Sequence, residues 1–231
     1  MDGLDYLGLV KTSLIDFPKE VAAVIFTFGC NLRCPYCHNP EFVHGSPPSD
    51  MWSREEVLRF LEKRRNVLGG VCITGGEPFL HPEIADLIGQ ISSLGLKIKV
   101  DTNGTSPELL RAVKPDYIAM DLKTIPGKYH LMGASEKQTA DILRSLDWLK
   151  GSGIPHEIRT TVLEPFVEES DMDEFAGMTD GADRLILARF RPGKTLDPFL
   201  SETPPPSPDF MKRLETLLAA RGIPVSLRPF S

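Results

Sequence analysis

The chain alternates short apolar runs with longer amphipathic runs, and this alternation restricts its fold more than any other feature. Runs rich in β-branched residues predict buried strands, and runs with apolar residues at a helical spacing predict helices between them. The predicted strands are residues 21–28, 71–74, 96–102, 117–122, 154–163 and 185–189. The predicted helices are residues 54–65, 82–94, 107–113, 137–150 and 171–178. Repeated strand–helix units imply a parallel sheet, and we expect an α/β fold, an open, partial TIM-type barrel of the (β/α)6 kind.

The two ends of the chain differ from this pattern. We expect residues 1–19 to be a short N-terminal segment, residues 20–199 to be the partial barrel and residues 200–231 to be a C-terminal extension. The extension begins with the proline-rich run 201–208, which should be extended and solvated. A helix over 210–220 follows, and residues 225–227 are a candidate edge strand.

Three cysteines follow the first predicted strand. Cys30, Cys34 and Cys37 have the spacing C-x3-C-x2-C, and His38 and Asn39 come directly after them. Three thiolates in eight residues can hold one metal centre, whereas four would close an iron–sulfur cluster. Three leave one iron able to bind another molecule, so the motif indicates catalysis rather than structural support.

Other readings of the cysteines remain open. A structural zinc site could use His38 as its fourth ligand, although such sites usually take two separated pairs of ligands. A disulfide framework is disfavoured because three of the four cysteines share one loop and the chain shows no secretory signal. Cys72 lies in an apolar run and is expected to be a buried small hydrophobic residue.

The overall charge and hydropathy exclude two classes of partner. The formal net charge is −6, from 26 Lys and Arg against 32 Asp and Glu, which argues against a nucleic-acid-binding surface. No apolar stretch is long enough to cross a bilayer, so we expect no membrane association. Residues 1–5 lack the basic and apolar regions of a signal peptide, and we expect a reducing, cytoplasmic location.

Polar motifs follow the predicted strands. The cysteine run comes after the first strand, Gly75-Gly76-Glu77-Pro78 after the second, and residues 101–104 and 121–123 close the third and fourth. Residues 159–161 lie within the fifth strand. Because strand ends of a β/α barrel share one mouth, these residues should converge on one site.

The motifs together resemble the radical S-adenosylmethionine (radical SAM) superfamily over about residues 20–190. Within it, residues 9–18, 34–41 and 190–198 look like the proteins that activate anaerobic ribonucleoside-triphosphate reductase, a glycyl radical enzyme. The resemblance implies that Cys30, Cys34 and Cys37 bind three irons of a [4Fe-4S] cluster and that S-adenosylmethionine binds the fourth. It further implies cosubstrate contacts from Tyr36, Asn39, Gly75, Gly76, Glu77, Asp101, Lys123 and Arg159.

The resemblance also implies a monovalent cation, Na+ or K+, beside the cosubstrate carboxylate. The expected ligands are Asp101, Thr102 and Asp121, because hard oxygen ligands suit such an ion. Asp101 could instead bind a ribose hydroxyl. Cys72 is the only spare thiol, so this chain cannot build a second cluster alone.

The implied function is that of a radical SAM oxidoreductase. A one-electron donor, flavodoxin or ferredoxin, would reduce the cluster, and cleavage of S-adenosylmethionine would give a 5′-deoxyadenosyl radical. That radical would remove a hydrogen atom from a glycine Cα of a partner glycyl radical enzyme, with anaerobic ribonucleoside-triphosphate reductase as the expected partner. Two alternatives stay open: the substrate is another glycyl radical enzyme or a small molecule, or the chain is a zinc-stabilised, non-catalytic binding module.

Overall fold

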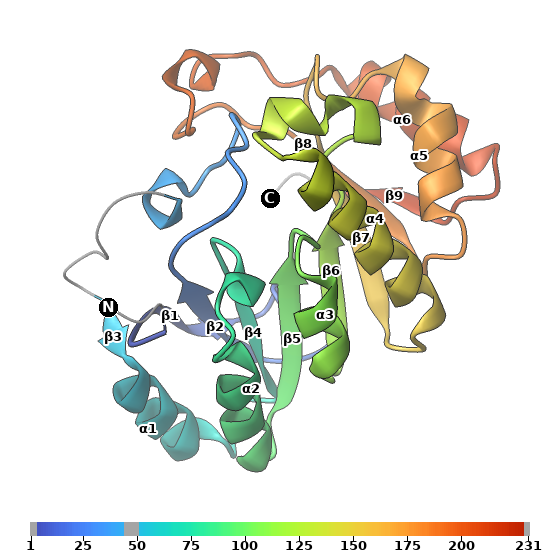
Figure 1. Cartoon of the computed structure of the whole chain (residues 1–231). Coiled ribbons are helices and arrows are strands. Elements are labelled where there is room, and N and C mark those ends of the chain that lie inside the picture. Colours follow the sequence, from blue (N-terminus) through green and yellow to red (C-terminus); the bar gives the residue numbers. More distant parts are fainter. Residues whose placement is uncertain (1–3, 44–50, 229–231) are drawn as a thin grey trace. The chain divides into compact units, whose positions relative to one another are not determined.

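The strands and helices follow the predicted alternation closely. The computed structural model describes residues 4–43 and 51–228 (Figure 1), so the parts of the predicted end segments at residues 1–3 and 229–231 lie outside the described residues. The strands are β1 Tyr6–Ser13, β2 Ala22–Thr27, β3 Trp52–Ser53, β4 Gly70–Gly75, β5 Lys97–Thr102, β6 Tyr117–Asp121, β7 His156–Val162, β8 Leu185–Arg189 and β9 Val225–Leu227. The α-helices are α1 Arg54–Arg64, α2 Ile84–Ser93, α3 Pro107–Ala112, α4 Glu136–Gly151, α5 Met172–Thr179 and α6 Pro208–Ala219.

The chain forms two compact units. The first takes in residues up to 31, 41–102 and 106–118, and the second takes in residues 32–40, 103–105 and 119–231. The cysteine loop and strand β6 each begin in the first unit and end in the second.

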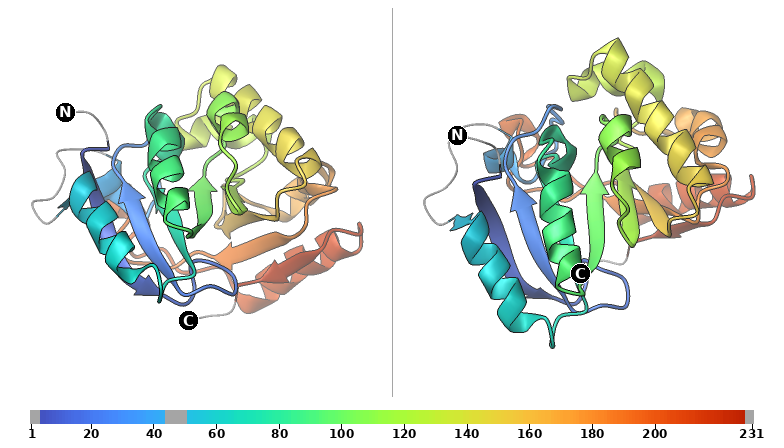
Figure 2. Two further views of the ribbon diagram at one scale, coloured as in Figure 1. Left: turned by 90° about the horizontal axis from the view of Figure 1, so that it is seen from below. Right: turned by 60° about the horizontal axis from the view of Figure 1, so that its bottom comes forward.

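The first unit is built on parallel strands with an antiparallel addition. Strands β2, β4 and β5 are parallel, and Cys72 lies opposite both Val24 and Lys99 in this register. Helices α1 and α2 lie side by side on these strands (Figure 2). Ile25, Ile73 and the other inward side chains are fully buried, and this apolar core fixes the strand ends that carry the polar motifs.

The first unit also contains a strand that the sequence analysis did not predict. Strand β1 pairs antiparallel with β2, with Val10 opposite Val24, and with the short strand β3. Residues 6–13 lie in the segment 1–19, for which the sequence predicted no secondary structure. Leu7 is the only fully buried residue of β1, so the apolar alternation that signals a strand is missing there.

The second unit holds the later strand–helix repeats. Strands β7, β8 and β9 are parallel, with Leu185 paired to both Ile158 and Val225. Helices α5 and α6 pack together, and α6 also contacts β8 and β9 (Figure 1). Phe210, Met211 and Leu214 of α6 are buried, so the C-terminal helix and edge strand belong to the core of this unit.

The predicted fold class is confirmed. The strand order is β3-β1-β2-β4-β5-β6-β7-β8-β9, which places β3 and β9 at its two ends and leaves the sheet open. Six strand–helix units run from β2–α1 to β8–α6, as expected for a (β/α)6 partial barrel. The predicted start of α1 is also confirmed, because Ser53 and Glu56 form a reciprocal capping box. Within residues 4–43 and 51–228, no helix combines the length and apolarity needed to cross a bilayer.

Candidate functional site

In the first unit, the beginning of the cysteine loop is fixed by backbone hydrogen bonds. Gly29 donates its N–H to the Phe42 carbonyl at 2.8 Å, and Glu77 donates its N–H to the Gly29 carbonyl at 2.8 Å. The His81 Nε2 atom bonds the Phe28 carbonyl at 2.7 Å. The turn after β4 therefore holds the residues that lead into Cys30.

The two glycines of this turn are required by their backbone neighbours. A Cβ atom on Gly76 would lie 1.9 Å from the Gly29 carbonyl oxygen, and one on Gly75 would lie 2.3 Å from the Thr27 carbonyl oxygen. Gly75 also has a φ of 119°, which L-residues rarely adopt. The structure therefore shows that both glycines are needed for close backbone packing. Their contact with the cosubstrate remains a prediction.

Glu77 is a fully buried carboxylate in the same turn. Its Oε1 atom accepts from the Thr102 hydroxyl at 2.7 Å and from the Phe79 N–H at 3.1 Å. These bonds join the end of β4 to the end of β5. Glu77 was expected to contact the cosubstrate, and these bonds show that it also orients the turn.

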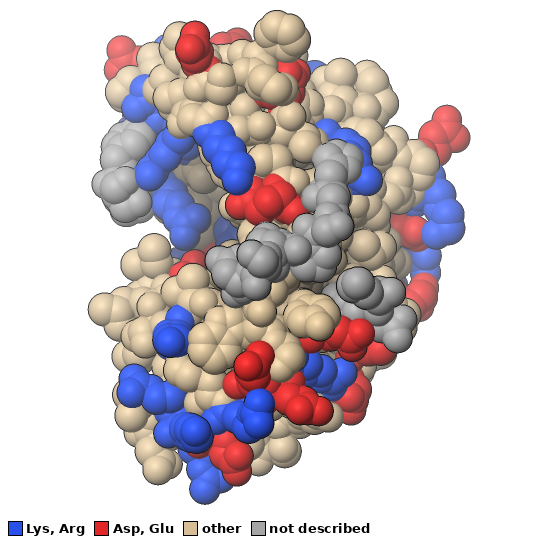
Figure 3. Space-filling view, turned by 90° about the vertical axis from the view of Figure 1, so that its left-hand side faces the viewer, with Lys and Arg blue, Asp and Glu red and all other residues tan. Residues whose placement is uncertain are grey.

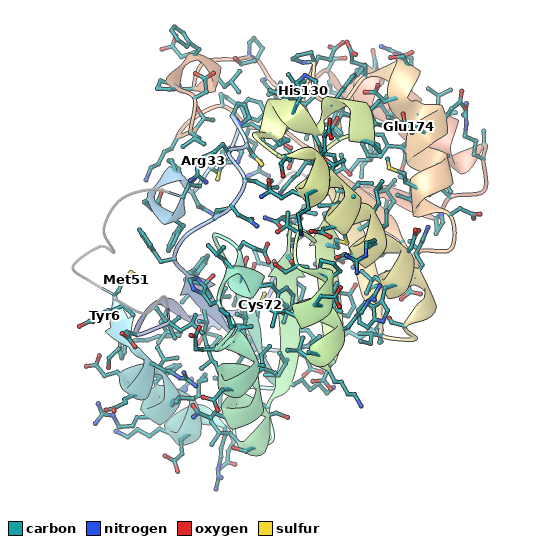
Figure 4. All side chains as sticks on the ribbon, in the orientation of Figure 1. Tyr6, Arg33, Met51, Cys72, His130 and Glu174 are labelled. Carbon is teal, nitrogen blue, oxygen red and sulfur yellow. The ribbon has the colours of Figure 1, made fainter. Side chains whose placement is uncertain are left out.

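Asp101 and Lys99 form a buried ion pair on β5. Lys99 is only 2% exposed, its ammonium contacts Asp101 Oδ1, and its Nζ lies 3.7 Å from the Cys72 Sγ atom. Cys72 is fully buried on β4, as predicted, and is labelled in Figure 4. The sequence analysis named Asp101 but missed its partner.

In the second unit, the rest of the cysteine loop is held by residues from distant parts of the sequence. Arg33, labelled in Figure 4, donates its N–H to the Met132 carbonyl at 2.8 Å, and Asp197 donates its N–H to the Pro35 carbonyl at 2.9 Å. The His38 ring stacks on Phe190 at 5.6 Å, and its Nε2 atom bonds the Arg191 carbonyl at 2.8 Å. His38 Nε2 must therefore carry the proton, because a carbonyl can only accept.

Tyr36 points its hydroxyl into the interior of the second unit. The residue is 4% exposed, its ring packs edge-on against Phe166, and within the described residues its buried hydroxyl has no hydrogen-bond partner. Burial and the nearby Cys34 thiol raise the pKa of Tyr36 well above its ordinary value, so the phenol stays protonated. A buried donor without an acceptor is the kind of group that a bound molecule satisfies.

Asp121, Lys123 and Arg159 meet in the second unit, as their strand-end positions predict. Lys123 Nζ lies 2.9 Å from Asp121 Oδ2, and Arg159 Nε lies 2.8 Å from Asp121 Oδ1. Burial alone would raise the pKa of Asp121, but the charges of Arg159 and Lys123 outweigh burial and hold this pKa well below its usual range. Burial likewise opposes the charge of Lys123, but Asp121, Cys34 and Tyr36 raise its pKa above the ordinary value.

The charge balance of this cluster is positive. Two fixed cations share one carboxylate, so the cluster of Asp121, Lys123 and Arg159 carries one net positive charge. A second carboxylate, such as that of an amino acid, can therefore bind here without leaving an excess of negative charge.

Tyr129 is a functional neighbour that the sequence analysis missed. It is fully buried, and its hydroxyl oxygen accepts the backbone N–H of Lys123 at 3.2 Å. Thr160 donates its hydroxyl to the Leu122 carbonyl at 2.8 Å, one residue earlier. Together these contacts fix the backbone that carries Lys123. A lone tyrosine twelve residues after the start of the predicted strand gives no periodic signal that could have identified it.

The thiols of the three cysteines are of the ligand type that binds iron–sulfur clusters, but within residues 4–43 and 51–228 no three Cys, His, Asp or Glu side chains are grouped closely enough to hold a metal ion. All four cysteines carry thiols rather than disulfides, with Cys30 and Cys37 partly exposed and Cys34 buried. The Cys37 N–H bonds the Cys34 carbonyl at 3.0 Å, which forms a tight turn between two of the thiols. Asn39, also predicted to contact the cosubstrate, is exposed on the loop. On the face drawn in Figure 3, both basic and acidic side chains are exposed, with several Lys and Arg side chains at the upper left.

Comparisons with known proteins agree with this description. Residues 24–179 match the model of the radical SAM superfamily. The chain is 29% identical over 220 residues to a Methanocaldococcus jannaschii protein named, provisionally, as a glycyl-radical enzyme activating enzyme, covering 90% of this chain and 88% of that protein. It is also 29% identical over 150 residues to the pyruvate formate-lyase-activating enzyme of Clostridium pasteurianum, covering 61% of this chain and 62% of that enzyme.

A solved structure supports the fold at lower identity. The Streptococcus suis protein SuiB, solved with S-adenosylmethionine bound, superposes with a TM-score of 0.66 at 17% identity over 88% of this chain and 48% of SuiB. At this identity the likeness concerns the fold alone. The family model covers more than half of the chain, and the predicted resemblance is confirmed: the chain belongs to the radical SAM superfamily.

Proposed function

We propose that this protein cleaves S-adenosylmethionine reductively at a [4Fe-4S] cluster and uses the product to activate a glycyl radical enzyme. The observation that carries the proposal is the set of three thiols in one eight-residue loop. Likeness over nine tenths of the chain to a protein named as an activating enzyme supports the choice of partner class. Anaerobic ribonucleoside-triphosphate reductase is the proposed partner, on the motifs at residues 9–18, 34–41 and 190–198.

The reduced cluster would pass one electron, taken from an external donor, to the sulfonium of S-adenosylmethionine, and the chemistry supplied would be a 5′-deoxyadenosyl radical, with methionine released, that can take a hydrogen atom from a glycine Cα. Cys30, Cys34 and Cys37 would hold the cluster. Lys123 and Arg159 would bind the cosubstrate carboxylate through the net positive charge left beside Asp121. Tyr36 would donate its unpartnered hydroxyl to the cosubstrate.

Four further residues are proposed to contact the cosubstrate. Gly75 and Gly76 would present backbone to the cosubstrate ammonium, and Asn39 would contact the cosubstrate from the exposed part of the loop. Asp101 is the candidate for a ribose hydroxyl. A flavodoxin or ferredoxin would donate the electron, and a reducing cytoplasm is the proposed location.

The 190–201 loop supports a protein as the substrate. It is tied to the cysteine loop through Asp197 and His38, and the Gly193 N–H to Ser201 carbonyl bond at 2.8 Å closes it. At its tip the short helix Pro198–Leu200 is capped by the Asp197 carboxylate, which accepts from the Phe199 N–H at 3.0 Å. Phe199 is 92% exposed. An aromatic side chain held rigidly in solvent is the usual anchor of a protein interface.

Iron and sulfide content separate the enzyme from a zinc-stabilised module. After oxygen-free reconstitution, we expect about four iron and four acid-labile sulfide per chain, and cleavage of S-adenosylmethionine with dithionite as reductant. Cys34→Ala should lose the brown chromophore and the cleavage. Cys72→Ala, which removes the thiol outside the loop, should keep both. Zinc in the loop without labile sulfide would contradict the proposal.

The partner is tested with purified anaerobic ribonucleoside-triphosphate reductase of the source organism. Mixing it with the reduced protein and S-adenosylmethionine should produce the doublet electron paramagnetic resonance signal of a glycyl radical. Phe199→Ala should reduce this signal about tenfold or more while leaving cleavage without partner unchanged, as for an interface anchor. Val67→Ala, which changes an exposed apolar residue of the first unit, is the matched control. Cleavage without any glycyl radical signal would favour another glycyl radical enzyme or a small-molecule substrate.

A point substitution at Phe199 is a sharper test than removal of the C-terminal extension. Residues 200–231 include α6 and β9, and β9 pairs with β8. Deleting them would expose the core around Leu214 and Leu218, so activity would fall for reasons of stability alone.

A further inference from the structure

The resemblance that predicted a monovalent cation also predicted its ligands, Asp101, Thr102 and Asp121. The structure gives each of these residues a different partner. We infer that the ammonium of Lys99 replaces the bound cation in this protein, so that cosubstrate binding needs neither Na+ nor K+. This inference rests on the proposed function, because it concerns the same cosubstrate.

The Asp101 carboxylate is already neutralised inside the first unit. Lys99 contacts its Oδ1 atom directly, and the side chains of Lys99 and Asp101 are 2% and 11% exposed. Both residues lie on β5 two positions apart, so their side chains share one face of the strand. A buried ammonium is stable only when it is paired, and Asp101 is its carboxylate partner.

Lys99 is held in a fixed position rather than lying loosely against Asp101. Its Nζ atom is also 3.7 Å from the Sγ atom of Cys72, which lies opposite Lys99 in the β4–β5 register. Because the long side chain is only 2% exposed, the positive charge stays at one place beside the carboxylate. A coordinated cation would otherwise supply this fixed positive charge beside Asp101.

Thr102 and Asp121 are also engaged. The Thr102 hydroxyl donates its proton to Glu77 Oε1 at 2.7 Å, a bond that fixes the rotation of the hydroxyl. In the second unit, Asp121 gives one carboxylate oxygen to Lys123 and the other to Arg159. Asp101 and Asp121 are each in contact with a positively charged side chain. Coulomb repulsion from that charge would oppose the binding of a cation to either carboxylate.

The closing experiment compares salts at one ionic strength. The affinity of the reconstituted protein for S-adenosylmethionine is measured in about 0.1 M tetramethylammonium, sodium or potassium chloride, so that screening is the same throughout. We expect the three affinities of the unaltered protein to agree within about twofold, since a built-in ammonium needs no added ion.

Three variants locate the effect at Lys99. Lys99→Ala removes the charge and leaves room for a hydrated ion, so its affinity in tetramethylammonium should fall about tenfold and recover in Na+ or K+. Lys99→Met removes the charge but fills the space, and it should lose affinity without recovery. Lys97→Ala is the matched control: Lys97 lies on the same face of β5 and pairs with Glu20, but it is 57% exposed, and no change is expected.

A second measurement needs no cosubstrate. Thallium-205 resonance broadening reports monovalent cation binding directly, and it should be absent for the unaltered protein and present for Lys99→Ala. Tl+ binding to the unaltered protein, or an affinity that rises tenfold with K+, overturns the inference while leaving the proposed function intact. Failure of the unaltered protein to bind S-adenosylmethionine in any salt would instead count against the proposed function. If Lys99→Ala does not fold, the two measurements on the unaltered protein still decide the question.

Discussion

The two units hold their parts of the cysteine loop in different ways. In the first unit, the contacts are between backbone atoms. The Gly29 N–H donates to the Phe42 carbonyl, and the Gly76 backbone lies so close to Gly29 that no Cβ atom fits between them. In the second unit, side chains do much of the holding. His38 stacks on Phe190, and the Tyr36 ring packs edge-on against Phe166.

This difference separates a steric constraint from an electrostatic one. Contacts between backbones tolerate no added atom, so they fix the path of the loop into Cys30 and leave little to adjust. The cluster of Asp121, Lys123 and Arg159 responds to charge, and therefore to pH and to ligands. We expect substitutions in the first region to act on folding and those in the second to act also on cosubstrate affinity.

The steric side of the comparison is tested by Gly76→Ala. Its Cβ atom would lie 1.9 Å from a carbonyl oxygen of the backbone, which cannot move aside as a flexible side chain could. We expect the free energy of unfolding to fall by about 3 kcal/mol or more, measured by chemical denaturation. Gly89→Ala is the control, because α2 leaves open space there, and it should stabilise the chain by about 1 kcal/mol. Equal effects of the two substitutions would remove the steric argument.

The electrostatic side is tested by Asp121→Asn. The pKa of Asp121 is lower in the folded chain than in the unfolded chain. Its contribution to stability is therefore complete above about pH 4, the ordinary pKa of an aspartate, and is lost as the pH falls further. The substitution also leaves Lys123 and Arg159 together without a carboxylate, and we expect a loss of about 2 kcal/mol at neutral pH.

Denaturation at a series of pH values measures this contribution. Between pH 5 and the acid limit, at about pH 2, the unaltered protein should lose stability more steeply than Asp121→Asn. Asp86→Asn is the control, because Asp86 pairs with Arg54 at the exposed surface of the first unit. A pH dependence unchanged by Asp121→Asn would show that Asp121 is not held ionised by its neighbours.

The sequence predicted much of the fold because the elements carry strong local signals. The capping box at Ser53 and the left-handed glycines Gly95 and Gly222 mark helix ends that the structure confirms. Strand β1 was missed for the opposite reason. It lies against β2 with only Leu7 fully buried, so its sequence has no apolar face that could be read without its partner.

The candidate site was predictable where residues stand at strand ends. Asp121, Lys123 and Arg159 meet because β6 and β7 are neighbours in the strand order, which follows from the repeated strand–helix pattern. The pairing of Lys99 with Asp101 was missed, although two charged residues two positions apart in a buried strand must share a face. The spacing of Lys99 and Asp101 therefore carried a signal in the sequence. Tyr129 carries no such signal, because its partner is a backbone N–H six residues earlier.

Tyr129→Phe is the finest test of the electrostatic region, because it deletes one oxygen atom and leaves every charge in place. The part-buried Lys123 N–H would lose its acceptor, which should cost about 1 kcal/mol of stability. With its backbone less constrained, Lys123 should also bind the cosubstrate carboxylate about three- to tenfold more weakly. Tyr6→Phe changes a tyrosine that is 46% exposed and should alter neither quantity. Loss of stability with unchanged affinity for S-adenosylmethionine would mean that Tyr129 supports the fold alone and does not position Lys123.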